Sequence, residues 1–182
     1  MKKQLVIVVT LLLILLLIRR VFGTTITNIT RLLPRHATKT FPTRNKSQIE
    51  QIVVHHTAGP ENQTPKQVAT YHVGPNHVCD SGCPGILYHY YITRSGKIYQ
   101  VNELETIAWH LAGQNTRSVG VVLAGNYDNY PATRAQLKAL NKTIKAIERK
   151  VGRSLELTTH RGECPGCTQC PGDYLQAQIA SV

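Results

Sequence analysis

The stretch Ile52-Val53-Val54-His55-His56-Thr57-Ala58-Gly59 indicates how the folded part of the chain is organised. Its β-branched run predicts a buried strand, and that strand ends abruptly in two histidines. A strand is a rigid element, so it holds imidazoles at its end in a fixed geometry. We therefore expect a functional site at the carboxyl end of this strand, completed by residues from later parts of the chain.

The sequence after residue 48 alternates between strand and helix patterns. Strands are expected at residues 49–55, 88–93, 97–101 and 119–124, and the glycine-containing segment 94–96 predicts a hairpin. A helix is expected to start at Thr64-Pro65, and a longer one to run from Thr133 to Gly152, with leucine and isoleucine at helical spacing. These patterns predict a mixed α/β (α+β) domain with a single central mixed β-sheet flanked by helices.

The first 23 residues are predicted to be a signal peptide or short membrane anchor. Lys2 and Lys3 precede the apolar run Leu5 to Ile18, which as a helix is about 21 Å long against a hydrocarbon core of about 30 Å. Arg19-Arg20 stands where a cleavage region is normally neutral, which favours an uncleaved anchor. We expect an extracytoplasmic domain, membrane-anchored through this segment or secreted.

The following segment, residues 24–47, is rich in Thr, Arg and Asn and contains prolines at positions 34 and 42. It shows no sustained periodicity, so it is interpreted as a stalk or linker that positions the domain. The folded domain is then expected to span residues 48–182.

The composition is strongly basic, with 21 Lys and Arg against 10 Asp and Glu. Such a chain attracts anions, whether nucleic acid, anionic lipid or an acidic wall polymer. The cations are scattered along the sequence, which contains no zinc-finger spacing, basic helix or aromatic RNA-binding signature. We therefore expect no nucleic-acid partner.

Five cysteines fall in two tight groups: Cys79, Cys83, Cys164, Cys167 and Cys170. In an oxidising compartment four of them can pair, which leaves one thiolate for a metal site. Hydrolytic zinc takes three protein ligands and keeps a fourth position for water. His55 or His56, together with His160 and Cys170, provides such a set. Cys164 is an alternative to Cys170 as the sulfur ligand, because both begin a Cys-Pro-Gly. The alternative to a metal site is that the histidines are buried in the core and bind no metal.

An ordered series of motifs extends from about Gln51 to Leu175. Its members are His55-His56-Thr57-Ala58, residues 88–96, Ala108-Trp109-His110, residues 115–120, Gly125-Asn126-Tyr127, His160-Arg161 and Cys170-Pro171-Gly172-Asp173. The series resembles the type 2 N-acetylmuramoyl-L-alanine amidases, a family that includes phage lysozymes and the peptidoglycan recognition proteins. The resemblance implies the fold of that family.

The resemblance also implies a role for individual residues. The zinc ligands correspond to His55, His160 and Cys170, and Tyr88 matches the catalytic tyrosine of the amidase members. His110 and Asn115 correspond to residues that line the substrate groove, and we add Thr168 and His56 to this substrate-binding set.

The implied function is a zinc-dependent amidase, active as a monomer, that hydrolyses the amide between N-acetylmuramic acid and the L-alanine of peptidoglycan. The alternative is a non-catalytic peptidoglycan-binding module, whose members commonly lose the cysteine that is present here as Cys170. The general acid is not identified, because Thr168 stands where lysozyme-type members have a lysine, as it does in recognition proteins.

The loop from His160 to Cys170 is longer than in the animal and phage members. Its additional cysteines leave three arrangements open. Local disulfides Cys79–Cys83 and Cys164–Cys167 are favoured, followed by cross-loop disulfides and then by a second, structural zinc bound by all four.

Overall fold

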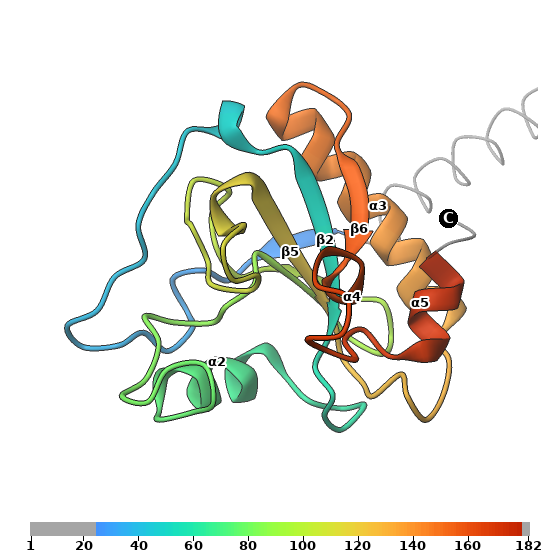
Figure 1. Ribbon diagram of the computed structural model, residues 1–182, viewed down its shortest axis with the longest axis horizontal. Helices are drawn as coiled ribbons and strands as arrows, with labels where there is room; N and C mark the ends of the chain where they lie inside the picture. The colour runs from blue at the N-terminus through green and yellow to red at the C-terminus, as the bar shows by residue number, and fades with distance from the viewer. Residues whose placement is uncertain (1–24, 180–182) are drawn as a thin grey trace, which may run out of the picture.

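A six-stranded mixed sheet with helices on both faces is the framework of the computed structural model, which describes residues 25–179 (Figure 1). The strands are β1 (Ile26–Asn28), β2 (Gln51–His56), β3 (Tyr90–Ile92), β4 (Ile98–Gln100), β5 (Ser118–Leu123) and β6 (Glu156–Thr159). Their order is β1-β4-β3-β5-β2-β6. All neighbouring strands are parallel except β3 and β4, which form the predicted hairpin. The predicted fold class is confirmed.

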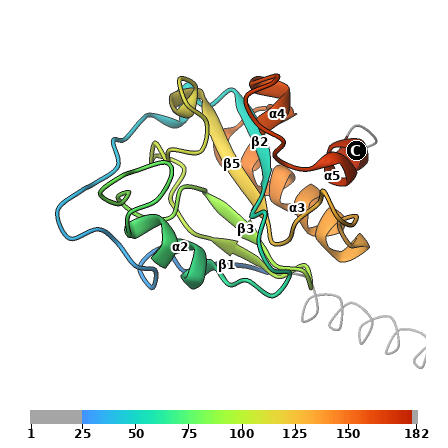
Figure 2. The same ribbon diagram turned by 60° about the horizontal axis from the view of Figure 1, so that its bottom comes forward.

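The helices are α2 (Pro65–Val73), α3 (Arg134–Val151), α4 (His160–Glu163) and α5 (Asp173–Ile179), with short 3-10 turns η1 (Lys46–Gln48) and η2 (Asn115–Arg117). Figure 2 shows α2 on one face of the sheet and α3 on the other. Within residues 25–179, no helix combines the length and the apolar character needed to cross a bilayer. The predicted signal peptide or anchor at residues 1–23 lies outside the described part of the chain.

Strand β2 lies inside the sheet between β5 and β6, and all six of its residues are buried. Such a strand needs apolar side chains on both faces, which explains its continuous β-branched run. Ile52 and Val54 pack in the core that includes α3. Because side chains alternate along a strand, His55 points to the opposite face, toward α2. The strand delivers His55 and His56 at its carboxyl end, as predicted.

Helix α3 has the signals at both ends that the sequence predicted. The Thr133 hydroxyl accepts a hydrogen bond from the Gln136 backbone N–H (3.1 Å), and the Gln136 side chain accepts one from the Thr133 N–H in return. At the other end Gly152 adopts φ 86°, a left-handed conformation that favours glycine. The helix boundaries agree with the prediction because these local signals are strong.

Residues 25–47 are part of the folded domain, so the prediction of a stalk that only positions it is wrong. Strand β1 pairs with β4 at the edge of the sheet. The Arg44 side chain is buried, and its guanidinium donates to the carbonyls of Leu104, Asn115, Thr116 and Ser118 at 2.7–2.9 Å. Burial lowers the pKa of Arg44 to about 10, so it stays charged near neutral pH.

Replacing Arg44 with alanine is expected to lower the free energy of unfolding by about 3 kcal/mol, because four carbonyls lose their shared donor. Arg31→Ala is the matched control in the same segment, since Arg31 is exposed, and it should change stability by less than about 0.5 kcal/mol. Urea unfolding of both variants measures the difference. Equal stabilities would show that the segment unfolds separately from the domain.

Candidate metal centre

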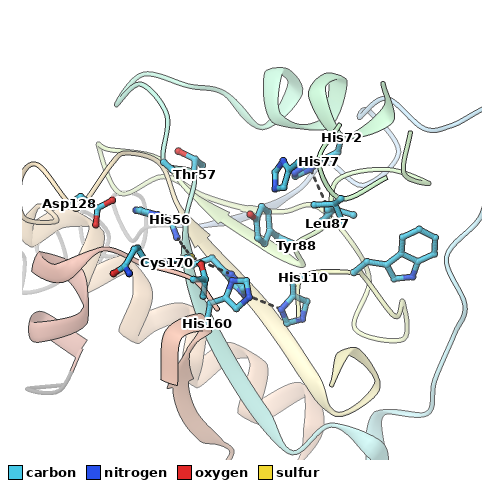
Figure 3. A pocket seen from close by; sticks show the side chains of 16 residues that line it. His56, Thr57, His72, His77, Leu87, Tyr88, His110, Asp128, His160 and Cys170 are labelled. Atoms are coloured by element: carbon cyan, nitrogen blue, oxygen red, sulfur yellow. Dashed lines mark hydrogen bonds between the residues drawn. The ribbon is translucent and has the colours of Figure 1, made fainter. Parts of the chain in front are cut away.

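Three potential metal ligands from distant parts of the chain meet at the carboxyl ends of β2 and β6. One ligand atom from each of His55, His160 and Cys170 lies within 4.8 Å of the other two. Ligands of open parallel sheets commonly bind outside the carboxyl ends of the strands, and this site has that position. Figure 3 shows His160 and Cys170 on one side of the cavity, with Tyr88 and His110 beside them.

His55 is the buried member of the three. Its Nδ1 lies 3.7 Å from the Cys170 Sγ, and its ring centroid lies 4.8 Å from that of His160. Two ligands of a tetrahedral zinc ion, one nitrogen and one sulfur, are about 3.6 Å apart when the bond lengths are ordinary. The His55–Cys170 separation therefore fits a shared metal ion with little adjustment.

His160 is placed by the register of β6 beside β2. Val54 pairs with Thr159, so the residue after each of them emerges at the same edge of the sheet. The Thr159 hydroxyl accepts a hydrogen bond from the Gly162 N–H (3.0 Å) and caps α4. This cap turns the chain directly after β6 and holds His160 on the first turn of the helix.

Cys170 is held by hydrogen bonds on three sides. Its carbonyl accepts from the Arg161 N–H (2.8 Å), and its own N–H donates to the Thr168 hydroxyl (3.1 Å). The His56 backbone N–H points at its Sγ at 3.4 Å, which favours the thiolate form. These contacts fix the sulfur relative to β2.

The other four cysteines form the two local disulfides that were favoured from the sequence, Cys79–Cys83 and Cys164–Cys167. Cys170 is the free thiol in the described part of the chain. A disulfide-bonded Cys164 offers no thiolate, so of the two candidates Cys170 is the one that the structure leaves free to bind a metal.

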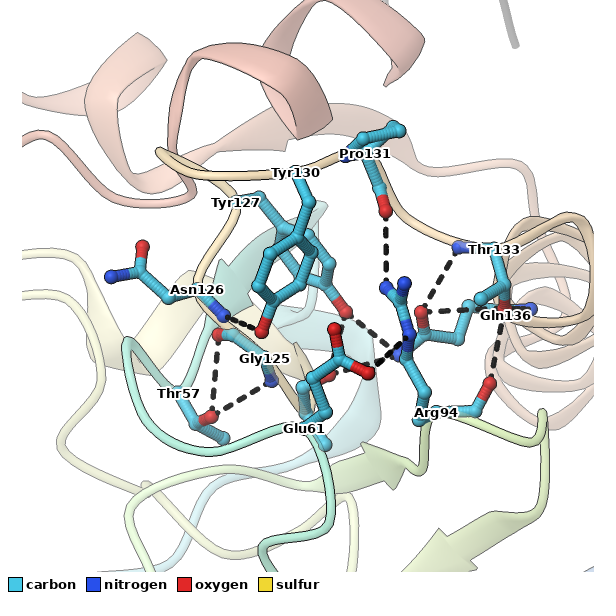
Figure 4. Close-up of polar contacts among 11 residues, drawn as sticks. Thr57, Glu61, Arg94, Gly125, Asn126, Tyr127, Tyr130, Pro131, Thr133 and Gln136 are labelled. Atoms are coloured by element: carbon cyan, nitrogen blue, oxygen red, sulfur yellow. Dashed lines mark hydrogen bonds and ion pairs between the residues drawn. The ribbon is translucent and has the colours of Figure 1, made fainter.

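The loop between β5 and α3, residues 124–133, packs against the segment that follows Cys170. Figure 4 shows the hydrogen bonds that Thr57 and Arg94 make with this loop, and the bond within the loop between the Tyr130 hydroxyl and the Asn126 N–H. The Gly125 N–H donates to the Thr57 hydroxyl (3.0 Å), and the Tyr174 N–H donates to the Tyr127 carbonyl (3.1 Å). Gly172 has φ 90°, and a Cβ there would overlap the Tyr127 backbone, so only glycine permits this approach.

The protonation states of His55, His160 and Cys170 are those of a site that releases one proton when it binds a metal. Burial lowers the pKa of His55 well below its ordinary value, and the nearby His110 and His160 lower it further. Burial also lowers the pKa of His160. Both imidazoles are therefore neutral ligands at neutral pH. Burial raises the pKa of the Cys170 thiol to about 12, so the thiol must lose its proton when a metal binds.

His110 lies directly behind His55 and orients its ring. The His55 Nε2 is 3.0 Å from the His110 Nδ1, and the His110 Nε2 is 3.4 Å from the Ser118 carbonyl. Burial lowers the pKa of His110 to about 3, so it is neutral and carries one N–H. With that N–H directed to Ser118, the Nδ1 accepts from His55, which leaves the His55 Nδ1 free to bind a metal.

Tyr88 lies beside the three ligands, with its ring centroid 5.2 Å from that of His55. Burial, followed by the charge of Cys170, raises the pKa of Tyr88, so it remains a phenol that donates a hydrogen bond. A neutral donor next to a metal site is suited to stabilising an oxyanion.

The ligands open into a cavity of about 370 Å³. Of the predicted substrate-binding residues, His56, His110 and Thr168 line it. The structure does not bring Asn115 to the cavity wall. The Asn115 side-chain oxygen instead accepts a hydrogen bond from the Leu111 N–H (2.7 Å) and holds the preceding loop.

Among the further residues that line the cavity are His72, His77, Trp109 and Asp128. None of these four residues was assigned a role from the sequence, although Trp109 lies in the motif Ala108-Trp109-His110. His72 lies on α2, and its Nδ1 accepts from the Leu87 N–H (3.3 Å), so it supports the wall near Tyr88. No local motif marks His72, His77 or Asp128, which come from α2, the loop after α2 and the loop after β5.

The domain is a mixed α/β fold that brings two histidines and one cysteine together at the carboxyl edge of its sheet, a donor set of the kind that binds zinc. Residues 45–173 match the family Amidase_2, N-acetylmuramoyl-L-alanine amidase, and the chain belongs to this family.

Known relatives include both amidases and recognition proteins. The chain is 28% identical over 163 residues to peptidoglycan-recognition protein SC2 of Drosophila simulans, covering 87% of this chain and 86% of the relative. Among solved structures, the amidase LysC from Clostridium intestinale superposes with a TM-score of 0.65 at 24% identity, covering 86% of this chain and 95% of that one. Peptidoglycan recognition protein-LE in complex with tracheal cytotoxin gives 0.72 at 20% identity, covering 86% and 93%. At these identities the solved structures support the fold alone.

Proposed function

We propose that this chain is a zinc-dependent amidase that hydrolyses the bond between N-acetylmuramic acid and L-alanine in peptidoglycan. The observation that carries the proposal is the complete donor set His55, His160 and Cys170 beside the phenol of Tyr88. A module that only binds peptidoglycan does not need a half-buried free thiol held next to two neutral imidazoles.

The donors fit zinc on chemical grounds. Two imidazole nitrogens and one thiolate are ligands that zinc prefers, and three protein ligands leave a position open, as hydrolytic sites require. The second contact of His55, through its Nε2 to His110, is the kind of outer hydrogen bond that metal-binding histidines usually make. A zinc ion held here would polarise the substrate carbonyl and lower the pKa of a bound water.

The chain's own residues then account for orientation and charge stabilisation. His110 holds the His55 ring in the ligand tautomer, and the His56 N–H stabilises the thiolate of Cys170. Tyr88 donates its hydroxyl proton in a hydrogen bond to the oxyanion that forms at the scissile carbonyl. His72, Trp109 and Thr168 line the walls that surround the substrate.

Similarity and chemistry support the proposed substrate class and location. The structural relative with tracheal cytotoxin holds a monomeric diaminopimelic acid-type peptidoglycan, and we extend peptidoglycan as a ligand to this chain. Two disulfides suit an oxidising, extracytoplasmic compartment.

The full-length chain, loaded with zinc, tests the function directly. We expect about one zinc per chain and the release of stem peptides with a free L-alanine amino group from purified peptidoglycan. If the zinc-loaded chain binds peptidoglycan but releases no peptide, it is a recognition module and the amidase proposal fails.

Zinc affinity is expected to increase about tenfold per pH unit from about pH 6.5 to about pH 8.5. The imidazoles of His55 and His160 are already neutral in this range, and the Cys170 thiol still carries its proton. Binding therefore releases one proton, and a higher pH favours it. Competition with a chelator at each pH measures the slope, and a slope near zero would show that the thiol is not a ligand.

Replacing His110 with alanine is expected to weaken zinc binding about 10- to 100-fold, because the His55 ring loses its orienting partner. His77→Ala is the control, since its ring lines the same cavity but contacts the Tyr71 hydroxyl. The zinc dissociation constant of each variant is measured by chelator competition. Equal zinc dissociation constants for the two variants would show that His110 does not orient His55 for metal binding and would leave it the role of a substrate-binding residue.

A further inference from the structure

The segment between the two later donors, His160 and Cys170, contains two more sulfur atoms. Cys164 and Cys167 form a disulfide within it. The three cysteines stand at intervals of three residues, and the first of them follows His160 by four. Four side chains that can bind zinc therefore lie within residues 160–170, and the candidate metal centre uses only two of them.

The Cys164–Cys167 disulfide is the more accessible of the two in the described part of the chain. Cys167 is exposed and Cys164 is half-buried, whereas Cys83 of the other disulfide is fully buried. Exposed disulfides are the ones that thiols reduce most readily, because the attacking thiolate must reach a sulfur of the bond. We therefore expect a dithiol to open Cys164–Cys167 before Cys79–Cys83.

The turn that carries Cys164 and Cys167 has backbone support of its own. The Cys167 N–H donates to the Cys164 carbonyl (3.2 Å), and Gly166 has φ 82°, the left-handed value that a type II turn requires at its third position. Pro165 suits the second position, because its ring fixes φ. The Cα atoms of the two cysteines are 5.6 Å apart, and this turn keeps them close together when the disulfide is cut.

Helix α4 and the end of the segment bring the other two donors toward this turn. The Cys164 N–H donates to the His160 carbonyl (3.0 Å), so these residues are one helical turn apart, the spacing at which side chains on a helix are neighbours. The Arg161 N–H donates to the Cys170 carbonyl (2.8 Å) and ties the end of the segment to its beginning. All four donors are therefore held in one compact loop.

We propose that reduction of the disulfide creates a second zinc site, whose ligands are His160, Cys164, Cys167 and Cys170. Three cysteines and one histidine, separated by two or three residues, are a donor set typical of structural zinc. Thiolates are soft ligands that zinc prefers, so the two freed sulfurs compete with His55 for the ion. The set differs from the structural zinc considered from the sequence, which used Cys79 and Cys83.

The conversion needs a reductant of the dithiol class. A thiolate of the dithiol attacks the Cys167 sulfur, and the Cys164 sulfur leaves as a thiolate. The second thiol of the reagent then displaces Cys167 and closes a disulfide ring, so two electrons pass from the dithiol to the protein. The two protons of the dithiol end on the freed sulfurs, and they go to solvent when zinc binds.

The two zinc sites share His160 and Cys170, so one chain fills one of them at a time. With the disulfide closed, three protein ligands leave a position for water, and with the disulfide reduced a fourth ligand fills that position. Hydrolysis is therefore confined to chains in an oxidising compartment. The inference rests on the proposed function in taking His160 and Cys170 as zinc ligands.

The test compares the oxidised and reduced full-length chain with two variants. His55→Ala removes the ligand that only the oxidised site uses. Cys164→Ser combined with Cys167→Ser removes the two ligands that only the reduced site uses, and it keeps Cys79–Cys83 as in the parent. Dithiothreitol is the reductant, and gel filtration under argon removes it before zinc or cobalt(II) is added. Alkylation and mass spectrometry identify the free cysteines.

We expect reduction to raise the sulfur-to-cobalt charge-transfer absorbance of the parent about threefold, because three thiolates replace one. The parent should bind about one zinc per chain in both states. His55→Ala should bind zinc at least about 100-fold more tightly after reduction, since the reduced site has four ligands and the oxidised site only two. The double serine variant should change in neither measurement.

The inference is overturned if the cobalt spectrum of the parent is unchanged by reduction, or if His55→Ala binds zinc equally in both states. Two zinc ions per reduced chain, or a Cys164–Cys167 bond that dithiothreitol cannot open in the folded chain, would also overturn it. None of these measurements uses peptidoglycan. Failure of the amidase proposal appears separately, as an oxidised, zinc-loaded parent that releases no peptide.

Discussion

Replacing Cys170 with alanine is expected to remove bound zinc and amidase activity together. The thiol is one of three donors within 4.8 Å, and the remaining two imidazoles form an incomplete site. Loss of an outer partner of a ligand costs about 10- to 100-fold in affinity, so loss of the ligand itself should exceed that range. Zinc content by atomic absorption and peptide release from peptidoglycan measure the two effects.

The control removes the neighbouring disulfide and keeps the thiol. Cys164→Ser combined with Cys167→Ser leaves Cys170 free and should retain zinc, with some loss of thermal stability. If this variant loses zinc while Cys170→Ala retains it, the sulfur ligand has been assigned to the wrong cysteine. Measurement below the melting temperature of each variant separates metal loss from unfolding.

Replacing Tyr88 with phenylalanine is expected to lower the turnover rate by about 10²- to 10³-fold while zinc remains bound. The change removes the hydroxyl and keeps the ring that packs 5.2 Å from His55. Because burial raises the pKa of Tyr88, the parent keeps its donor in alkaline solution, and its activity should not fall there through ionisation of this phenol.

Tyr91→Phe is the matched control for Tyr88→Phe. Its hydroxyl donates to the Gln63 carbonyl (2.6 Å) and does not line the catalytic cavity, so its loss should leave the turnover rate within about twofold. Steady-state rates and zinc content are compared for both variants. A Tyr88→Phe enzyme with the parental rate would limit Tyr88 to a packing role.

The sequence predicts those parts of the fold that are specified locally. The apolar run of β2, the hairpin around Gly96 and the caps of α3 at Thr133 and Gly152 each depend on a few adjacent residues. In contrast, β1 has three residues, two of them exposed, and shows no apolar pattern. Its place in the sheet depends on pairing with β4, which is remote in sequence, so it was interpreted as part of a linker.

In the candidate site, too, some features could be predicted from the sequence and others depend on tertiary packing. The ordered motifs select His55, His160 and Cys170, which the structure brings together. Whether a residue faces the cavity depends on how its loop folds back. Asn115 turns its side chain to the Leu111 backbone, and His72 reaches the cavity wall from α2. Such orientations arise from tertiary packing, and no sequence spacing encodes them.

The separation of the donors along the chain determines when the site becomes complete during synthesis. His55 and Cys170 are 115 positions apart, and His160 also precedes the cysteine. A nascent chain can therefore form β2 and expose His55 long before the sulfur ligand has been made. Any product that stops before residue 170 lacks the third donor, so the proposed metal site can be completed only after translation has passed that residue.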